Sequence, residues 1–358
     1  MQTRRSFLQE LALAAAGAAL LPRLQLRASA KSGARLPVIG AGEHTYECLH
    51  DWVQPPPGLL WGETHAVCED DDGNIYIGHT VHRDSPRSEA IVAYDAAGRF
   101  IRAFGAEFRG GAHGLALRRE RDGSYLYHSD IAHCATAKLT LTGEVVWRHG
   151  YPREDARYPS PPIPYKPTNI AFAPSGEYFV ADGYGSSHVL HYAADGSFLG
   201  EIGRPGTGHA RRDAPDGDLR TPHSLWVDLR NGPPALAIAD RSNHRIQVFA
   251  LDGRHLHTVR DPRLRLPCHC HTQGEWMVCP DLDSQVCILD RAYHVVLQLG
   301  DGQAHNGKLF SRRSQSRDQF TPGEFICPHD AIFLRNGDIL VAEWLPIGRI
   351  TRLRRVAG

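Results

Sequence analysis

The stretch PTNIAFAPSGEYFVADGY, residues 167–184, decides the fold because its pattern returns along the chain. Two short runs of strand-forming residues flank a turn signal, which is typical of a β-hairpin. A second hairpin follows, here HVLHYAADGSFLGEIG. Related stretches begin at Thr64, Ala112, Pro222, Pro267 and Pro328. The chain therefore repeats one double hairpin six times.

Six units with a period of about 50 residues predict an all-β, six-bladed β-propeller. One unit cannot bury both of its faces, so the units must stack around an axis. A β-sandwich and an open solenoid are the competing folds, but the chain is long for a sandwich, and a closed ring removes exposed strand edges. We expect residues 44–50 (HTYECLH) to supply a strand that closes the ring, and residues 311–320 (SRRSQSRDQF) to form a loop.

The N-terminal residues have the features of an export signal. Paired arginines in TRRSFLQ, residues 3–9, precede an apolar run and the small-residue sequence Ala28-Ser29-Ala30. This order resembles a twin-arginine signal peptide. A membrane anchor is the alternative, but the apolar run is about half of the ~20 residues that a spanning helix needs. We expect a signal peptide over 1–30, a propeller domain over 31–358, no later membrane segment, and a periplasmic or secreted protein.

Charge and cysteine content narrow the partners further. The 40 basic residues balance 40 acidic ones, so no net field attracts nucleic acid. We expect a monomer with a small-molecule or peptide substrate. Eight cysteines are present, and their pairing cannot be read from the sequence. In the cluster Cys268-His269-Cys270-His271, neighbouring residues of an extended chain point to opposite faces. A disulfide or buried thiols are therefore favoured there over a metal site.

One position of the repeat is rich in histidine. In a propeller the first strand of each blade lies nearest the axis, and its first residues border the central channel. This position holds, in blades one to six, His65, His113, Thr168, His223, His269 and His329. Equivalent positions stand at equal angles around the axis, so the histidines of blades two, four and six form a triangle. Three converging imidazoles suit a zinc-type ion with one open position; the alternative is that each caps a strand end.

The ordered phrases AHGL, DGY, PHSL, ADR and PHD resemble those of the peptidyl-α-hydroxyglycine α-amidating lyases, which are six-bladed propellers of the NHL type. The resemblance covers blades two to six. It implies a zinc ion held by His113, His223 and His329. It also implies a base at Tyr184 and a substrate-binding arginine at Arg241.

The same resemblance implies a structural calcium ion near that end of the channel. Asp330 would supply a carboxylate, and Val67 and Leu115 would supply backbone carbonyls. Oxygen ligands of this kind suit a hard cation.

The chain departs from the family's pattern at two places. The family has a second active-site arginine where Thr80 stands, and Arg83 lies three residues further on and could replace it. The family has a methionine where Cys327 stands, and this thiol could be a ligand or a packing residue. His65 and His269 share the repeat position of the proposed ligands, so each could join or replace one.

These observations favour an exported zinc lyase that cleaves the C–N bond of an α-hydroxyglycine or a similar N-acyl hemiaminal to an amide and glyoxylate. One alternative is a non-catalytic NHL propeller that binds a protein or glycan partner. The other is a propeller hydrolase or lactonase. It is less favoured because the propeller lactonases that would be compared with this chain bind calcium through Glu, Asn and Asp, whereas the axis predicted here is rich in histidine.

Overall fold

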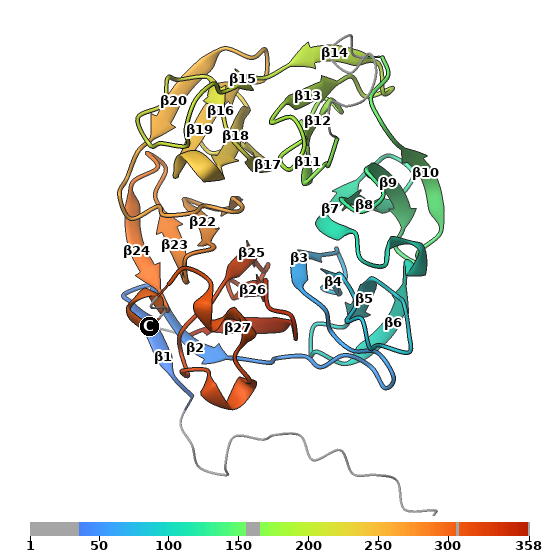
Figure 1. Cartoon of the computed structure of the whole chain (residues 1–358), viewed down its shortest axis with the longest axis vertical. Helices are drawn as coiled ribbons and strands as arrows, with labels where there is room; N and C mark the ends of the chain where they lie inside the picture. The colour runs from blue at the N-terminus through green and yellow to red at the C-terminus, as the bar shows by residue number, and fades with distance from the viewer. Residues whose placement is uncertain (1–35, 155–164, 306–307, 357–358) are drawn as a thin grey trace, which may run out of the picture. The chain divides into compact units, whose positions relative to one another are not determined.

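Six antiparallel sheets follow one another around a centre in the computed structural model (Figure 1). The structure describes residues 36–154, 165–305 and 308–356. The predicted signal peptide, residues 1–30, lies outside the described residues. The strands of blades one to three run in chain order from the inner to the outer edge: β3 (Thr64–Glu69), β4 (Ile75–His79), β5 (Ile91–Tyr94) and β6 (Phe100–Phe104); β7 (Ala112–Arg119), β8 (Ser124–Asp130), β9 (Ala135–Thr140) and β10 (Val145–His149); β11 (Asn169–Phe172), β12 (Tyr178–Ala181), β13 (Val189–Tyr192) and β14 (Phe198–Glu201).

Blades four to six repeat this arrangement, and the prediction of a six-bladed all-β propeller is confirmed. Their strands are β17 (Pro222–Asp228), β18 (Ala235–Asp240), β19 (Arg245–Ala250) and β20 (His255–Val259); β21 (His271–Gln273), β22 (Trp276–Asp281), β23 (Gln285–Leu289) and β24 (Val295–Leu299); β25 (Pro328–Phe333), β26 (Ile339–Glu343) and β27 (Arg349–Arg355). Between blades three and four, β15 (Arg204–Pro205) pairs in parallel with β16 (Asp218–Leu219).

The N-terminal part of the described chain closes the ring, as the sequence predicted. Strand β2 (His44–Leu49) pairs antiparallel with β27, with Cys48 opposite Leu353, and β1 (Val38–Ala41) pairs with β2. In Figure 1 the blue N-terminal strands lie beside the red C-terminal blade. The last blade therefore contains strands from both ends of the propeller.

The helical segments among the described residues are short 3₁₀ turns. They are η1 (Ala106–Phe108), η2 (Arg241–Asn243), η3 (Gln303–His305), η4 (Ser311–Ser314) and η5 (Arg317–Gln319). Two of them, η4 and η5, fall in the segment 311–320 that the sequence assigned to a loop. Within the described ranges, no helix has the length and hydrophobicity to cross a membrane.

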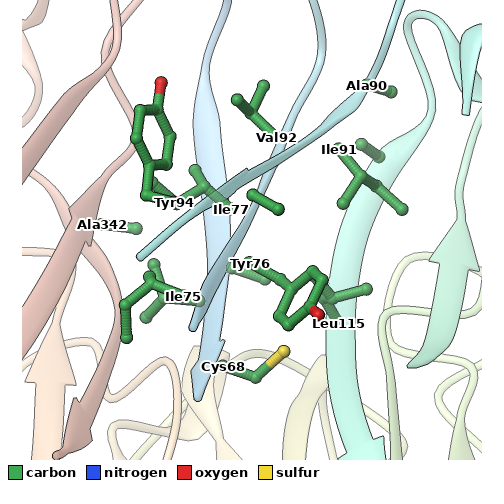
Figure 2. Packing of buried hydrophobic residues seen from close by; sticks show 14 of the residues in the cluster. Cys68, Ile75, Tyr76, Ile77, Ala90, Ile91, Val92, Tyr94, Leu115 and Ala342 are labelled. Atoms are coloured by element: carbon green, nitrogen blue, oxygen red, sulfur yellow. The ribbon is translucent and has the colours of Figure 1, made fainter. Parts of the chain in front are cut away.

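Apolar side chains fill the space between neighbouring blades. Figure 2 shows Ile77 and Val92 from blade one packed in a cluster that also contains Leu115 from β7 and Ala342 from β26. These four side chains are at most 5% exposed. Burial of aliphatic side chains at about 25 cal/mol per Å² is the main force that holds such sheets together. The packed blades fix the inner strands, and residues 37–358 form one compact unit.

Candidate functional site

Four histidines begin the inner strands of four blades, and each lies at an irregularity of the sheet. The strand register shifts at His65 in β3, at His113 in β7, at His223 in β17 and at His329 in β25. A local bulge turns a side chain away from the regular pleat. The repeated phrase therefore gives the histidine the same altered side-chain direction in blades one, two, four and six.

The four imidazoles lie together at the axis. The ring centroids of five of their pairs are 4.5 to 4.8 Å apart. One ring nitrogen from each of His65, His113 and His329 lies within 4.8 Å of the others. His223 joins the group through its contacts with His113 and His329. The structure thus brings together the three histidines of the predicted triangle and adds His65.

The three predicted histidines share an anchor that His65 lacks. In each, Nδ1 donates a hydrogen bond to a backbone carbonyl of the next blade, because a carbonyl can only accept. The three contacts are His113 to Thr168 at 2.7 Å, His223 to Cys268 at 2.8 Å and His329 to His65 at 2.7 Å. A proton on Nδ1 leaves the lone pair on Nε2, and metal-binding histidines are oriented in this way.

The first of these anchors depends on a glycine. A Cβ atom added to Gly114 would lie 2.4 Å from the Thr168 carbonyl oxygen. A contact that short is not tolerated, so only glycine lets this carbonyl approach β7. The glycine after His113 therefore serves the orientation of the imidazole.

The second predicted group, Tyr184 and Arg241, lies beside His223. The Tyr184 hydroxyl is 3.1 Å from Nε2 of His223, and Nη1 of Arg241 donates to the same hydroxyl at 3.1 Å. The guanidinium carbon of Arg241 lies 5.1 Å from the centre of the Tyr184 ring. Arg241 begins η2, directly after β18. The phrases DGY and ADR thus place a phenol and a cation at one corner of the histidine group.

Burial controls the ionisation of this group. It lowers the pKa of all four imidazoles, and the nearby Arg241 guanidinium adds to the effect. The pKa of His65 falls to about 3. Burial raises the pKa of the Tyr184 phenol, and Arg241 opposes this as a smaller effect. The imidazoles are therefore neutral near pH 7 and available as ligands.

Two residues of the expected calcium site, Val67 and Asp330, are joined by a hydrogen bond. Oδ2 of Asp330 accepts a hydrogen bond from the Val67 amide at 2.9 Å. Oδ1 of Asp330 is 2.5 Å from Nδ1 of His269, but the two atoms are not aligned for a hydrogen bond. Val67, Leu115 and His269 line a central cavity of about 340 Å³.

Two other candidates lie apart from the histidines. The Arg83 side chain is 89% exposed, and its ionic partner is Asp84. Cys327 is fully buried in an apolar cluster with Cys268 and Leu345, and burial raises the pKa of its thiol. The structure therefore favours a packing role for Cys327 and gives Arg83 no contact with the group among the described residues.

The cluster at 268–271 contains buried thiols and forms no ligand group. Cys268 and Cys270 are free thiols that are 0% and 1% exposed. Cys268 Sγ lies 3.9 Å from Nη1 of Arg241. Nδ1 of His271 accepts a hydrogen bond from the Phe333 amide. Of the two alternatives favoured by the sequence, buried thiols are the one observed.

Sequence reasoning missed two charged residues near His65. Oε2 of Glu63 is 3.7 Å from Nε2 of His65, and Oε1 of Glu63 pairs with Arg313. Arg313 also donates to the Trp344 carbonyl at 2.8 Å. Arg313 lies outside the repeated phrases, and Glu63 lies just before one. No local signal connects these two residues, which are 250 positions apart.

Comparisons with known proteins agree with the fold and the phrases. The chain is 30% identical over 262 residues to a probable peptidyl-alpha-hydroxyglycine alpha-amidating lyase of Caenorhabditis elegans, covering 72% of this chain and 67% of that protein. It is 27% identical over 339 residues to peptidyl-alpha-hydroxyglycine alpha-amidating lyase 1 of Drosophila melanogaster, covering 85% and 59%. Of two peptidyl-glycine alpha-amidating monooxygenases of Xenopus laevis, the chain spans only 16% and 15%.

Solved structures support the fold alone. A streptogramin B lyase structure superimposes with a TM-score of 0.56 at 13% identity and covers 90% of this chain and 100% of that one. No family model matches the sequence. The similarity to the nematode lyase extends over two thirds of both chains, and it accompanies a six-bladed fold with the AHGL, PHSL and PHD histidines at its axis. The chain therefore belongs to the peptidyl-α-hydroxyglycine α-amidating lyase family.

Proposed function

We propose that the protein is a zinc-dependent lyase that cleaves the C–N bond of an α-hydroxyglycine or a similar N-acyl hemiaminal to an amide and glyoxylate. The observation that carries this proposal is the shared anchor of three imidazoles, each held through Nδ1 by a carbonyl of the next blade. A tyrosine and an arginine stand beside one of them. The family named in the relatives supports the same reaction.

The donor set suits a zinc ion, and the choice of the third histidine rests on the carbonyl anchor. The ring nitrogens that lie within 4.8 Å of one another belong to His65, His113 and His329, whereas it is His223 that shares the anchor with His113 and His329. His113, His223 and His329 would hold it through Nε2, and Nε2 of His113 is buried without a hydrogen-bond partner among the described residues. Three neutral imidazoles with one open position are typical of catalytic zinc. Bound there, the metal would polarise the substrate's oxygen atoms and favour loss of the hydroxyl proton.

Tyr184 is the proposed base. It takes the hydroxyl proton of the substrate; the oxygen lone pair then forms the C=O bond of glyoxylate, the C–N bond breaks, and the nitrogen leaves with the electron pair and takes up a proton. No water is consumed. The phenol must lose its own proton first; burial raises its pKa, and Arg241 opposes this rise. A divalent cation on His223 would act in the same sense.

Arg241 has a second proposed role. Its guanidinium donates to Tyr184 and to the Cys268 sulfur, and it has no carboxylate partner among the described residues. A buried cation without an anion is costly. A substrate carboxylate would supply the missing partner through a bidentate pair. This contact would hold the substrate with its hydroxyl toward the phenol.

We further propose a calcium ion at Asp330. Oδ1 of Asp330 is buried without a hydrogen bond, and Val67 and Leu115 lie on adjacent inner strands. His269 Nδ1, 2.5 Å away, is the competing partner of this oxygen. Removal of calcium by a selective chelator should lower the thermal midpoint of wild-type protein and leave Asp330→Asn unchanged. Equal midpoints for wild type with and without calcium would contradict this part of the proposal.

The arginine pair in residues 3–9 supports export through the twin-arginine route. A fusion of residues 1–35 to a reporter that matures only in the cytoplasm should reach the periplasm in a bacterial host, and replacing Arg4 and Arg5 with lysine should abolish export. Export that persists in this variant would point to another route.

The deciding experiment combines metal analysis with product detection. Protein purified without added metal should contain about one zinc ion per chain, as expected for a three-histidine site. His223→Ala should lose the zinc, and His65→Ala should keep it, because His65 lacks the carbonyl anchor. Wild-type protein should release glyoxylate from an N-acyl-α-hydroxyglycine. If the protein contains zinc but releases no glyoxylate from any such compound, the proposed reaction is wrong, and the protein is a binding propeller that a metal stabilises.

A further inference from the structure

A polar cleft of about 400 Å³ opens beside Tyr184 and Arg241, over blades three and four. Its other lining groups include Arg220, Thr221, Ser187 and the backbone of residues 183–185. Clefts of this volume hold small organic ligands. Tyr184 contacts His223, so a lining residue of this cleft is in contact with the histidine group.

The charges of the cleft all have one sign. Its two charged residues are Arg220 and Arg241, and no acidic side chain occurs among its described lining residues. Nη1 of Arg220 donates to the Gly208 carbonyl at 2.7 Å. Within the described ranges, Arg220 has no carboxylate partner for its side chain. Two arginines that have no carboxylate partner within the described ranges therefore line one cleft.

Asp240, a carboxylate bonded to the backbone of Arg220, does not cancel this charge. Asp240 accepts a hydrogen bond from the backbone amide of Arg220 at 2.7 Å. Its carboxylate pairs with Arg245 at 2.7 Å, and both side chains are fully buried. It also accepts from Gln247. Asp240 thus holds the backbone at Arg220, while Arg245 balances the negative charge of its carboxylate.

Backbone strain marks the same cleft. Thr221 has φ 53° and Ser187 has φ 65°. Positive φ is rare for residues other than glycine, and a β-branched residue such as threonine is especially unfavourable there. The two residues are joined, because the Thr221 amide donates to Ser187 Oγ at 3.2 Å. Strain of this kind persists where the surrounding structure fixes the backbone, and it is concentrated at functional sites. Here the strained residue Thr221 lies in the turn between Arg220 and His223.

We propose that Arg220 forms a second anion subsite, so that the substrates carry a negatively charged acyl group in addition to the α-carboxylate. This inference rests on the proposed lyase function. Arg241 binds the α-carboxylate next to Tyr184, and Arg220 binds an anion on the acyl chain. N-succinyl-α-hydroxyglycine is an example: cleavage of its C–N bond gives succinamate and glyoxylate, with the hydroxyl proton removed and one proton added to the nitrogen.

The test compares an anionic and a neutral acyl group. Wild-type protein should cleave N-succinyl-α-hydroxyglycine with a kcat/KM about 10-fold or more above that for N-acetyl-α-hydroxyglycine, the size expected for one charge-assisted hydrogen bond. Arg220→Gln should remove this preference and leave the acetyl compound nearly unchanged. Arg220→Lys, which keeps the charge, should retain part of it. Arg211→Gln, at an exposed arginine of the same segment that does not line the cleft, is the matched control.

A binding measurement separates this inference from the reaction. N-succinylglycine lacks the hydroxyl group and cannot react, and calorimetry should show tighter binding than for N-acetylglycine, with the difference lost in Arg220→Gln. If neither hydroxy compound is cleaved but this difference is present, the lyase proposal fails and the subsite remains. Equal loss for both acyl groups in Arg220→Gln, or no preference in wild type, would overturn the subsite.

Discussion

The Tyr184 hydroxyl lies 3.1 Å from Nε2 of His223 and receives a hydrogen bond from Arg241 on its other side. His223 already donates from Nδ1 to the Cys268 carbonyl, so its Nε2 can only accept, and the phenol must donate to it. A metal bound at Nε2 would take over this lone pair. The Tyr184 hydroxyl would then lose its hydrogen bond to His223 and could bond to the substrate instead.

Tyr184→Phe should therefore abolish most of the activity while leaving the metal in place. Loss of a positioned general base typically costs 10²- to 10⁴-fold in rate, and we expect kcat to fall by about this factor with zinc content unchanged. Tyr94→Phe is the control, because Tyr94 is a buried tyrosine whose hydroxyl bonds to the Gln54 carbonyl. Equal activity of Tyr184→Phe and wild type would exclude the phenol as the base.

Gly114→Ala should weaken metal binding although residue 114 contacts no metal. The added Cβ would lie 2.4 Å from the Thr168 carbonyl oxygen, and this carbonyl orients His113. Loss of such a supporting bond typically lowers metal affinity about 10- to 100-fold. A zinc competition titration with a coloured chelator measures it. Gly150→Ala, which meets no atom within 4 Å, should bind zinc as wild type does, and unchanged affinity in Gly114→Ala would contradict the anchoring role.

The sequence predicted the parts of the site that the repeat places. His113, His223 and His329 occupy one position of the repeat, and ring symmetry converts that position into a location at the axis. The phrases DGY and ADR likewise located Tyr184 and Arg241. The histidine positions needed only the local pattern and the closure of the ring, whereas Tyr184 and Arg241 were implied by the resemblance to the lyase family.

The rest of the site depends on contacts that the repeat does not encode. Glu63 and Arg313 meet across 250 positions, and neither belongs to a shared phrase. The family resemblance offered Arg83 as a replacement for a missing arginine, but its side chain is 89% exposed. His269 was considered as a metal ligand, and its Nδ1 lies 2.5 Å from a carboxylate oxygen of Asp330. Side-chain direction at bulges and in loops depends on tertiary packing, which periodicity does not specify.

A buried histidine outside the proposed ligand group, His79, should make the protein sensitive to acid. Nδ1 of His79 accepts hydrogen bonds from the Gly62 and Val81 amides, and burial lowers its pKa to about 3. In the unfolded chain this imidazole takes up a proton near pH 6.5. Between these values the unfolded state binds more protons, so the free energy of unfolding falls as pH decreases from 6.5 toward 3.

The contribution of His79 should be about 2 kcal/mol between pH 7 and pH 5. His79→Asn keeps an acceptor for the two amides and cannot be protonated. Urea denaturation at the two pH values should show a loss of stability that is smaller in this variant by about that amount. His209→Asn, at an exposed histidine, should lose as much stability as wild type, and an equal loss in His79→Asn would contradict the assignment.

The last blade should depend on a buried ion pair. Glu343 accepts two hydrogen bonds from Arg349 and one from the Ile326 amide, and the two side chains are at most 1% exposed. Glu343→Gln would leave a buried guanidinium without an anion, which typically costs about 3–5 kcal/mol. The pair lies in the hairpin that joins β26 to β27, and β27 carries the closing strand β2. Unfolding in urea should show this loss, whereas Glu47→Gln, which removes the exposed partner of Arg354, should cost less than about 1 kcal/mol. Similar losses in both variants would show that closure of the ring does not rest on the buried pair.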